Sequence, residues 1–132
     1  MALAEIDAGA DIIFTMLNAG RIGAIEACRE RGVLQIGNVV DWYPIAPDVF
    51  IASAIADVSI PAFLAAEDFI SGTLKLETKR RIGLDAPEAV RLAMAPSVPL
   101  EIQTEVEALA AKIVAGAIEV LTCYEGGEEF EA

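Results

Sequence analysis

The sequence contains no histidine among its 132 residues. This absence excludes general-base catalysis by imidazole and zinc sites that use histidine ligands. Positive charge is also scarce, with 9 Lys and Arg against 21 Asp and Glu, which gives a formal net charge of -12. Because nucleic-acid phosphates and anionic lipid surfaces repel such a chain, we expect neither as a partner. Cationic or neutral small molecules and protein partners remain open.

Long hydrophobic runs and common catalytic motifs are absent too. No apolar run reaches the roughly 20 residues of a membrane-spanning helix, and the first residues read as the end of a helix rather than as a signal peptide. The carboxylates do not follow the spacing of a zinc protease, and no glycine-rich dinucleotide motif follows a strand. Serine and threonine lack an evident activating partner. These absences predict a binding domain without catalytic residues, metal or cofactor.

Cysteine occurs only at Cys28 and Cys123. The two can form a disulfide, but their spacing does not demand one. We expect Cys28 to be buried as a small hydrophobic residue and Cys123 to be free. With 55% hydrophobic residues, the chain can bury the core of one domain, which we expect at residues 1–121. The acidic segment 122–132 is expected to be flexible.

Alternating strand and helix patterns predict an α/β domain with a mostly parallel sheet and helices on both faces. Helix ends are marked by glycine, and Gly32 also follows two arginines, which suit the last turn of a helix. The predicted strands are 11–17, 33–39 and 48–56, and the predicted helices are 3–9, 21–31, 57–72 and 100–116.

The remaining segments carry a different pattern. Apolar and charged side chains alternate between residues 73 and 84, as Leu74, Lys75 and Leu76 illustrate. This alternation is typical of an edge strand with one wet face. We expect it to form an antiparallel edge hairpin with 89–95, and we expect a further short strand at 118–121.

Ligands of open α/β sheets bind beyond the carboxyl ends of the strands. Loop 17–23 lies at such a position, where Asn18 and Gly20 precede a predicted helix. Free backbone N–H groups there can hold an anion or a carbonyl group. An ordinary strand-to-helix turn explains the same residues equally well.

Two further loops hold candidate ligand-binding residues. Trp42 can stack on a planar ring and Asp41 can accept hydrogen bonds from hydroxyl or N–H groups. A partly exposed tryptophan is more often a rim or interface residue, and Tyr43 is an alternative for the stacking role. Loop 52–59 contributes Ser53 and Asp57, although Asp57 can equally cap the following helix.

Several short sequence pieces occur in a characteristic order. They are Gly9-Ala10-Asp11, Ile36-Gly37, Asp41, Ala46-Pro47-Asp48, Ser53, Gly83-Leu84, Met94-Ala95-Pro96, and Lys112-Ile113 with Gly116, Ile118 and Val120. Their order resembles the C-terminal lobe of the basic membrane protein family, and the likeness extends to about residue 121. Members of this family are solute-binding lipoproteins of ABC transporters, including purine nucleoside receptors.

The resemblance implies a periplasmic-binding-protein fold of the sugar-receptor type, in which two α/β lobes enclose a ligand. It implies a nucleoside-like ligand, an ABC permease as partner, and a lipid-anchored protein on the periplasmic or extracellular side. The family's N-terminal lobe, signal peptide and lipid-bearing cysteine are not in this sequence. We therefore expect that lobe as a partner, and we expect the isolated lobe to self-associate through exposed apolar surface.

Some positions depart from the family pattern. Val39 and Trp42 replace an aspartate and a glutamine, and Ala56 and Asp85 replace two lysines. The loss of two cationic groups leaves open a purine nucleoside or a different, even cationic, ligand. Asp85 is either a ligand-binding or a turn residue. The alternative functions are a stand-alone oligomeric or regulatory module without ligand binding and, less favoured without histidine, an enzyme.

Overall fold

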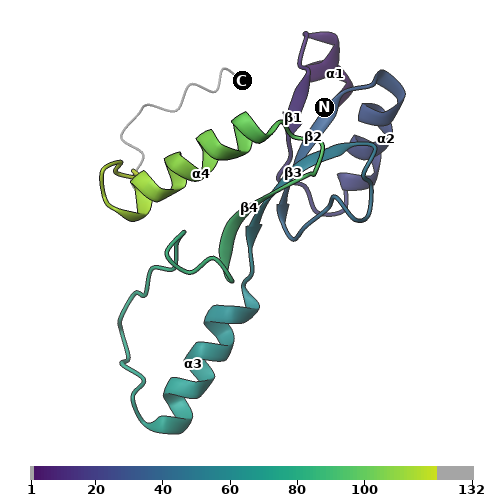
Figure 1. The fold of residues 1–132 in the computed structure, drawn as a ribbon. Coiled ribbons are helices and arrows are strands. Elements are labelled where there is room, and N and C mark those ends of the chain that lie inside the picture. Colours follow the sequence, from purple (N-terminus) through teal and green to yellow (C-terminus); the bar gives the residue numbers. More distant parts are fainter. Residues whose placement is uncertain (1, 122–132) are drawn as a thin grey trace.

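The computed structural model describes residues 2–121, so the predicted flexible segment 122–132 and Cys123 lie outside the described residues. Figure 1 shows how the helices and strands follow one another. Their order is α1 (Ala2–Asp7), β1 (Ile12–Phe14), α2 (Arg21–Arg31), β2 (Leu34–Val39), β3 (Phe50–Ala56), α3 (Ser59–Ser71), β4 (Val90–Met94) and α4 (Leu100–Val114).

The four strands form one sheet in the order β1-β2-β3-β4. The first three run parallel, with Phe14 opposite Ile36 in the first pair. β4 runs antiparallel to β3, and Ala56 at the end of β3 pairs with Val90 at the start of β4. The carboxyl ends of the parallel strands therefore share one edge of the sheet. The predicted α/β class with a mostly parallel sheet is confirmed.

Local signals explain the β1-α2-β2 crossover. Gly32 ends α2 in a left-handed conformation with φ 66 and donates its N–H to the carbonyl of Cys28. Glycine adopts this conformation without the steric penalty that a side chain brings. Arg29 in the last turn forms an ion pair with Asp48. Because water screens the two exposed charges, such a pair adds little to the stability of the fold.

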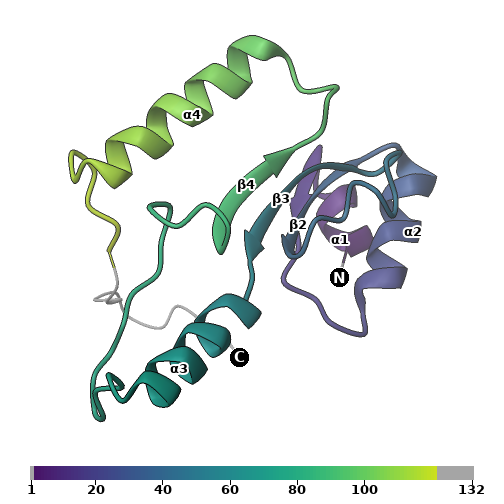
Figure 2. The same cartoon turned by 60° about the horizontal axis from the view of Figure 1, so that its bottom comes forward.

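The core lies between the sheet and α2, beside α1 (Figure 2). Its buried members are Ile13, Cys28, Ala46, Val49 and Phe50. The Cys28 side chain is fully buried and its thiol is free, as predicted. The side chain of Gln35, also fully buried, donates from Nε2 to the sulfur of Cys28 at 3.1 Å.

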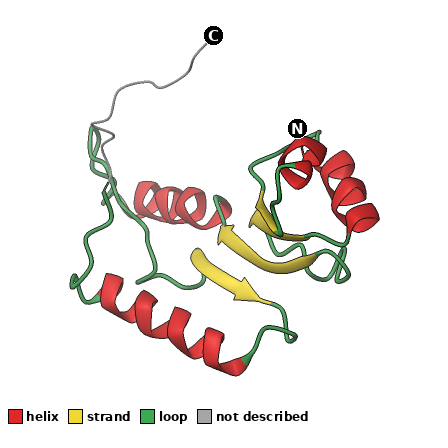
Figure 3. Ribbon diagram, turned by 90° about the horizontal axis from the view of Figure 1, so that it is seen from above, coloured by secondary structure: helices red, strands yellow, loops and turns green. Residues whose placement is uncertain are grey.

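Helices α3 and α4 extend away from the sheet (Figures 1 and 2), and Figure 3 gives the view of the same elements from above. Neither helix contains a buried residue, and Phe69 of α3 is 72% exposed. Within the described part of the chain, these two helices therefore leave large apolar side chains uncovered, among them Phe63, Phe69 and Leu109.

Two predicted strands are absent from the described part. Residues 73–84 form turns and irregular chain, so the predicted hairpin with 89–95 is wrong, and β4 pairs with β3 instead. Glu77 has φ 58, which breaks the extended conformation that a strand needs. Residues 118–121 form no strand either. A segment with a period-2 pattern forms a strand only where the edge of another strand is available for pairing.

Candidate functional site

A connected group of side chains lies at the carboxyl edge of the parallel strands. We call it the Arg21 cluster, and its members are Arg21, Asn38, Trp42 and Ser53. They come from the start of α2, the end of β2, the loop after β2, and β3. Contacts between them join three segments that are separate in the sequence.

Arg21 occupies the centre of the cluster. Its side chain is only 6% exposed, and its Nη2 donates to the carbonyl of Leu17 at 2.5 Å and to Oδ1 of Asn38 at 2.6 Å. Its Cζ lies 3.9 Å from the centroid of the Trp42 ring. Burial lowers the pKa of the guanidinium from its usual value, but arginine keeps its charge in proteins. The positive charge therefore lies against the aromatic face of Trp42 and forms hydrogen bonds with two neutral acceptors.

Trp42 is fixed from several sides. Its backbone N–H donates to Oγ of Ser53 at 3.0 Å, and its indole N–H donates to the carbonyl of Asn38 at 3.0 Å. Its ring packs on Phe50 with centroids 5.9 Å apart. A Cβ added to Gly37 would lie 2.6 Å from Cδ1 of Trp42, so only glycine allows this close approach. Arg21 therefore lies over one face of a rigidly held ring.

Two polar atoms of this edge are buried without a hydrogen-bond partner among the described residues. They are Nη1 of Arg21 and Oγ1 of Thr15. Thr15 directly follows β1 and donates its N–H to the carbonyl of Ile36 at 3.2 Å, which places it level with Gly37 of β2. Leaving a buried donor or acceptor unpaired costs about 1–3 kcal/mol. The edge therefore holds unsatisfied polar groups close to the sheet.

The predicted loop 17–23 adjoins this cluster. Asn18 is exposed, and its carbonyl accepts the backbone N–H of Arg21 at 3.2 Å. Gly20 precedes the first turn of α2, which has no side-chain cap. Asn18 and Trp42 thus both contact Arg21, which brings the first two predicted loops together.

The second and third predicted loops are linked through Ser53. This side chain is fully buried, and its Oγ accepts the Trp42 N–H. Asp41 is exposed, and its Oδ1 accepts the backbone N–H of Tyr43 at 3.1 Å. Asp41 therefore stands at the solvent side of the same loop and stabilises its turn.

Asp57 and Asp85 have local partners. Oδ1 of Asp57 accepts the hydroxyl of Ser59 at 2.6 Å and its N–H at 2.9 Å. These bonds, the hydroxyl first, lower the pKa of Asp57. They hold the turn before α3, whose N-cap position is Val58 and has no side-chain cap. Oδ1 of Asp85 accepts the Gly83 N–H at 3.2 Å, as a turn residue does. No hydrogen bond or ion pair within residues 2–121 joins either aspartate to the Arg21 cluster.

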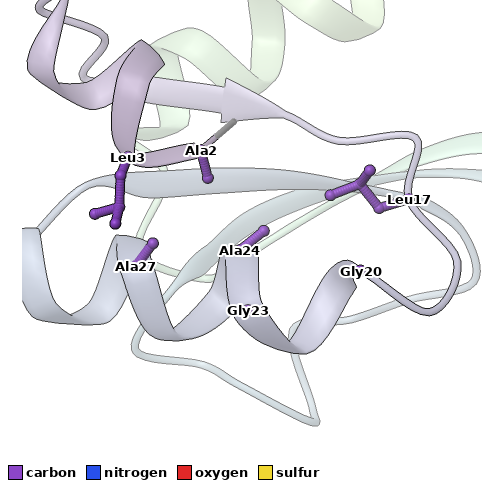
Figure 4. A pocket seen from close by; sticks show the side chains of 7 residues that line it. All are labelled: Ala2, Leu3, Leu17, Gly20, Gly23, Ala24 and Ala27. Atoms are coloured by element: carbon purple, nitrogen blue, oxygen red, sulfur yellow. The ribbon is translucent and has the colours of Figure 1, made fainter.

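An apolar pocket of about 340 Å³ lies between α1 and α2 (Figure 4). Of the predicted site residues, only Gly20 lines it. Its walls are Ala2, Leu3, Leu17, Gly20, Gly23, Ala24 and Ala27. Because these side chains are apolar or absent, the pocket offers no side-chain hydrogen bond to a polar solute. Another, more open pocket of about 960 Å³ includes Asp85.

Metal chemistry has no evident centre in residues 2–121, where no group of three or more Cys, Asp or Glu gathers. Nor is any helix there long and apolar enough to span a membrane.

The residues that sequence reasoning missed are Thr15, Arg21 and Asn38. One signal was available, because arginine at the first helical position opposes the helix dipole and is unusual there.

Comparison with known proteins identifies the family. The family described as Bmp, ABC transporter substrate-binding protein PnrA-like, matches residues 1–122. No curated protein matches the chain. A solved structure described as a transcriptional activator of the comK gene from Bacillus halodurans is similar, with a TM-score of 0.76 and 18% identity over 87% of this chain and 40% of that one.

A second similar structure is an ABC transporter solute-binding protein from Conexibacter woesei DSM 14684. Its TM-score is 0.62 and its identity 23%, over 91% of this chain and 40% of that one. This chain thus spans 40% of each of the two structures. Both likenesses support the α/β fold, and the likeness to the solute-binding protein supports a periplasmic-binding-protein-like arrangement. The family match over residues 1–122 shows that the chain belongs to the Bmp family of PnrA-like ABC transporter substrate-binding proteins.

Proposed function

We propose that this chain is one lobe of a solute-binding protein that holds a nucleoside-like small molecule for an ABC permease and does not transform it. The family match over residues 1–122 carries the proposal. The Arg21 cluster supports it, because it lies at the carboxyl edge of parallel strands, where α/β sheets bind ligands.

The polar groups of this edge suit recognition rather than catalysis. Asp41 is exposed beside the rigidly held Trp42, and its carboxylate can accept hydrogen bonds from sugar hydroxyls. Asn18 offers an exposed side-chain amide beside Arg21. A nucleoside would fit here through its sugar, whereas the Trp42 face under Arg21 is already occupied.

The second lobe of the binding protein is the proposed partner of the uncovered surfaces. Helix α3 lies apart from the sheet and exposes Phe63 and Phe69. Exposed apolar patches of several hundred Å² ordinarily meet another protein surface. The proposed protein acts outside the cytoplasm, anchored by lipid, with its cleft closing between two lobes.

Nucleoside titration of the complete protein tests the proposal. Calorimetry should detect binding of adenosine or inosine, and the emission of Trp42 should change on binding. The variant Asp41→Asn should weaken binding by about tenfold through loss of a charged acceptor. The variant Asp68→Asn on distant α3 is the control and should bind normally. Absence of binding by every nucleoside would contradict the proposed ligand class.

A second candidate is an oligomeric or regulatory module that does not bind a solute. The uncovered helices α3 and α4 favour it, since neither contains a buried residue. Sedimentation of the 132-residue chain with and without nucleoside separates the candidates. A stable oligomer that ignores every nucleoside would support the module.

A further inference from the structure

The guanidinium of Arg21 is a buried positive charge without an acidic partner in the described part of the chain. Its two hydrogen-bond acceptors are the neutral Leu17 carbonyl and Asn38 amide. Elsewhere in residues 2–121, Arg29 and Arg31 each meet an aspartate. Buried charges ordinarily pair with an opposite charge, because burial removes their hydration. The site therefore lacks one negative charge.

Two further observations at the same place favour an anion. Nη1 of Arg21 is buried without an acceptor among the residues that the structure describes, although the guanidinium forms its strongest hydrogen bonds with anionic oxygens. Arg21 is also the first residue of α2, which has no side-chain cap. The first N–H groups of a helix carry partial positive charge and lack intrahelical acceptors. The unpaired Nη1 donor of Arg21, its positive charge and the N-terminal end of the α2 dipole thus lie at the same place.

We propose that Arg21 is the specificity-determining residue of this site and that the solute carries an anionic oxygen, on a carboxylate or a phosphate group, which binds at the start of α2. The inference rests on the proposed solute-binding function. In the proposed arrangement, the face of the Trp42 ring supports the guanidinium group of Arg21. Asn38 fixes Nη2, so that Nη1 remains for the solute.

Binding requires a local adjustment. Nη1 is buried, so the loop between β1 and α2, residues 15–20, has to shift to admit an oxygen. Because the guanidinium lies 3.9 Å from the ring centroid of Trp42, that shift changes the environment of the indole. Trp42, the only tryptophan, therefore reports on the event by its fluorescence.

The net charge of -12 does not prevent such binding. At physiological ionic strength, charges more than about 8 Å apart are largely screened in water. The contact with Arg21 takes place within a hydrogen-bond length and away from water, where its attraction is strongest. The acidic surface slows the approach of an anion more than it weakens the bound state.

A matched ligand series on the complete protein tests the inference. Adenosine, AMP and adenosine 5′-carboxylate are titrated by calorimetry against the native protein, Arg21→Met and Arg21→Lys. Arg29→Met is the control, because Arg29 is exposed on the same helix. The native protein and the control should prefer an anionic member over adenosine by about tenfold or more. The better of AMP and the carboxylate identifies the anionic group.

The Arg21 variants separate recognition from support. Arg21→Met should abolish the preference for the anionic member while adenosine still binds, and Arg21→Lys should keep part of it. Equal binding of all three ligands by the native protein overturns the inference and leaves the proposed function intact. An equal loss of affinity for all three ligands in Arg21→Met also overturns the inference, since that result shows only that Arg21 supports Trp42.

Inorganic phosphate gives a readout that needs no nucleoside. Phosphate should change Trp42 emission saturably in the native protein and in Arg29→Met, but not in Arg21→Met. No change in the native protein, combined with no preference for AMP or the carboxylate over adenosine, overturns the inference. A phosphate response without any nucleoside binding supports the Arg21 site and contradicts the nucleoside-like ligand class. Circular dichroism of Arg21→Met and Arg21→Lys verifies that both variants fold.

Discussion

The two halves of this chain use their apolar residues differently. In residues 2–56, the sheet and α2 enclose a core in which Phe50 is 1% exposed. In residues 59–114, α3 and α4 form from equally clear local signals, but neither buries a residue. The comparison teaches that helix formation and helix packing are separate events, because capping needs only neighbouring residues whereas burial needs a partner surface.

The largest expected effect comes from comparing two phenylalanines. Phe50→Ala should destabilise the fold by about 3–5 kcal/mol, because it leaves a cavity in the core. Phe69→Ala in exposed α3 should change the unfolding free energy by about 0.5 kcal/mol or less. Denaturant unfolding measures both. Similar losses would break the comparison and show that α3 packs in solution.

A glycine pair sharpens the comparison within the first half. Gly37→Ala should destabilise the fold by about 1–3 kcal/mol, because its Cβ has no room beside Trp42. Gly23→Ala in α2 meets no atom within 4 Å and should stabilise the helix by about 0.5–1 kcal/mol. Thermal melting followed at the Trp42 emission measures both shifts. A neutral Gly37→Ala would disprove the close packing of Trp42.

The exposed apolar side chains of residues 59–114 should cause self-association. We expect the 132-residue chain to self-associate, and Phe69→Glu should raise its dissociation constant by about tenfold by placing charge in the contact. Sedimentation over a concentration series measures this change. Glu67→Gln on the same helix is the control, because it leaves the apolar residues intact. A chain that stays monomeric at every concentration contradicts the expectation.

The smallest effect concerns the start of α3. Hydrogen bonds from Ser59 lower the pKa of Asp57. The ionised carboxylate therefore adds stability above the ordinary pKa of aspartate, and this contribution is lost as pH falls through the lowered value. Ser59→Ala should raise the pKa of Asp57 toward its ordinary value. NMR titration of that carboxyl group checks it, and an unchanged pKa would exclude Ser59 as the cause.

The fold was largely predictable from short-range patterns. Gly9, Gly32 and Gly72 each mark the end of a predicted helix, and each has positive φ, as the sequence indicates. The three parallel strands were also found, because their apolar runs are continuous. The edge strand at 73–84 failed, since alternation alone does not show whether a sheet edge is available to pair with it.

The candidate site was predictable only in position. The rule for α/β sheets selects the loops that contain Asn18, Trp42 and Ser53, and the structure links these residues through Arg21. The role of Arg21 was not predictable, because a surface arginine and a buried one look alike in a sequence. The predicted ligand roles of Asp57 and Asp85 remain predictions.

The sequence by itself determined the α/β order of elements, the helix ends and the absence of imidazole chemistry, because these depend on local conformation and on composition. Only the tertiary structure decided that Arg21 lies buried on Trp42 without a carboxylate partner among residues 2–121, since the two residues are 21 positions apart in the chain. It also decided that β4 pairs with β3 and that α3 and α4 remain uncovered. Pairing and burial depend on which surfaces meet in space, and local sequence does not specify that.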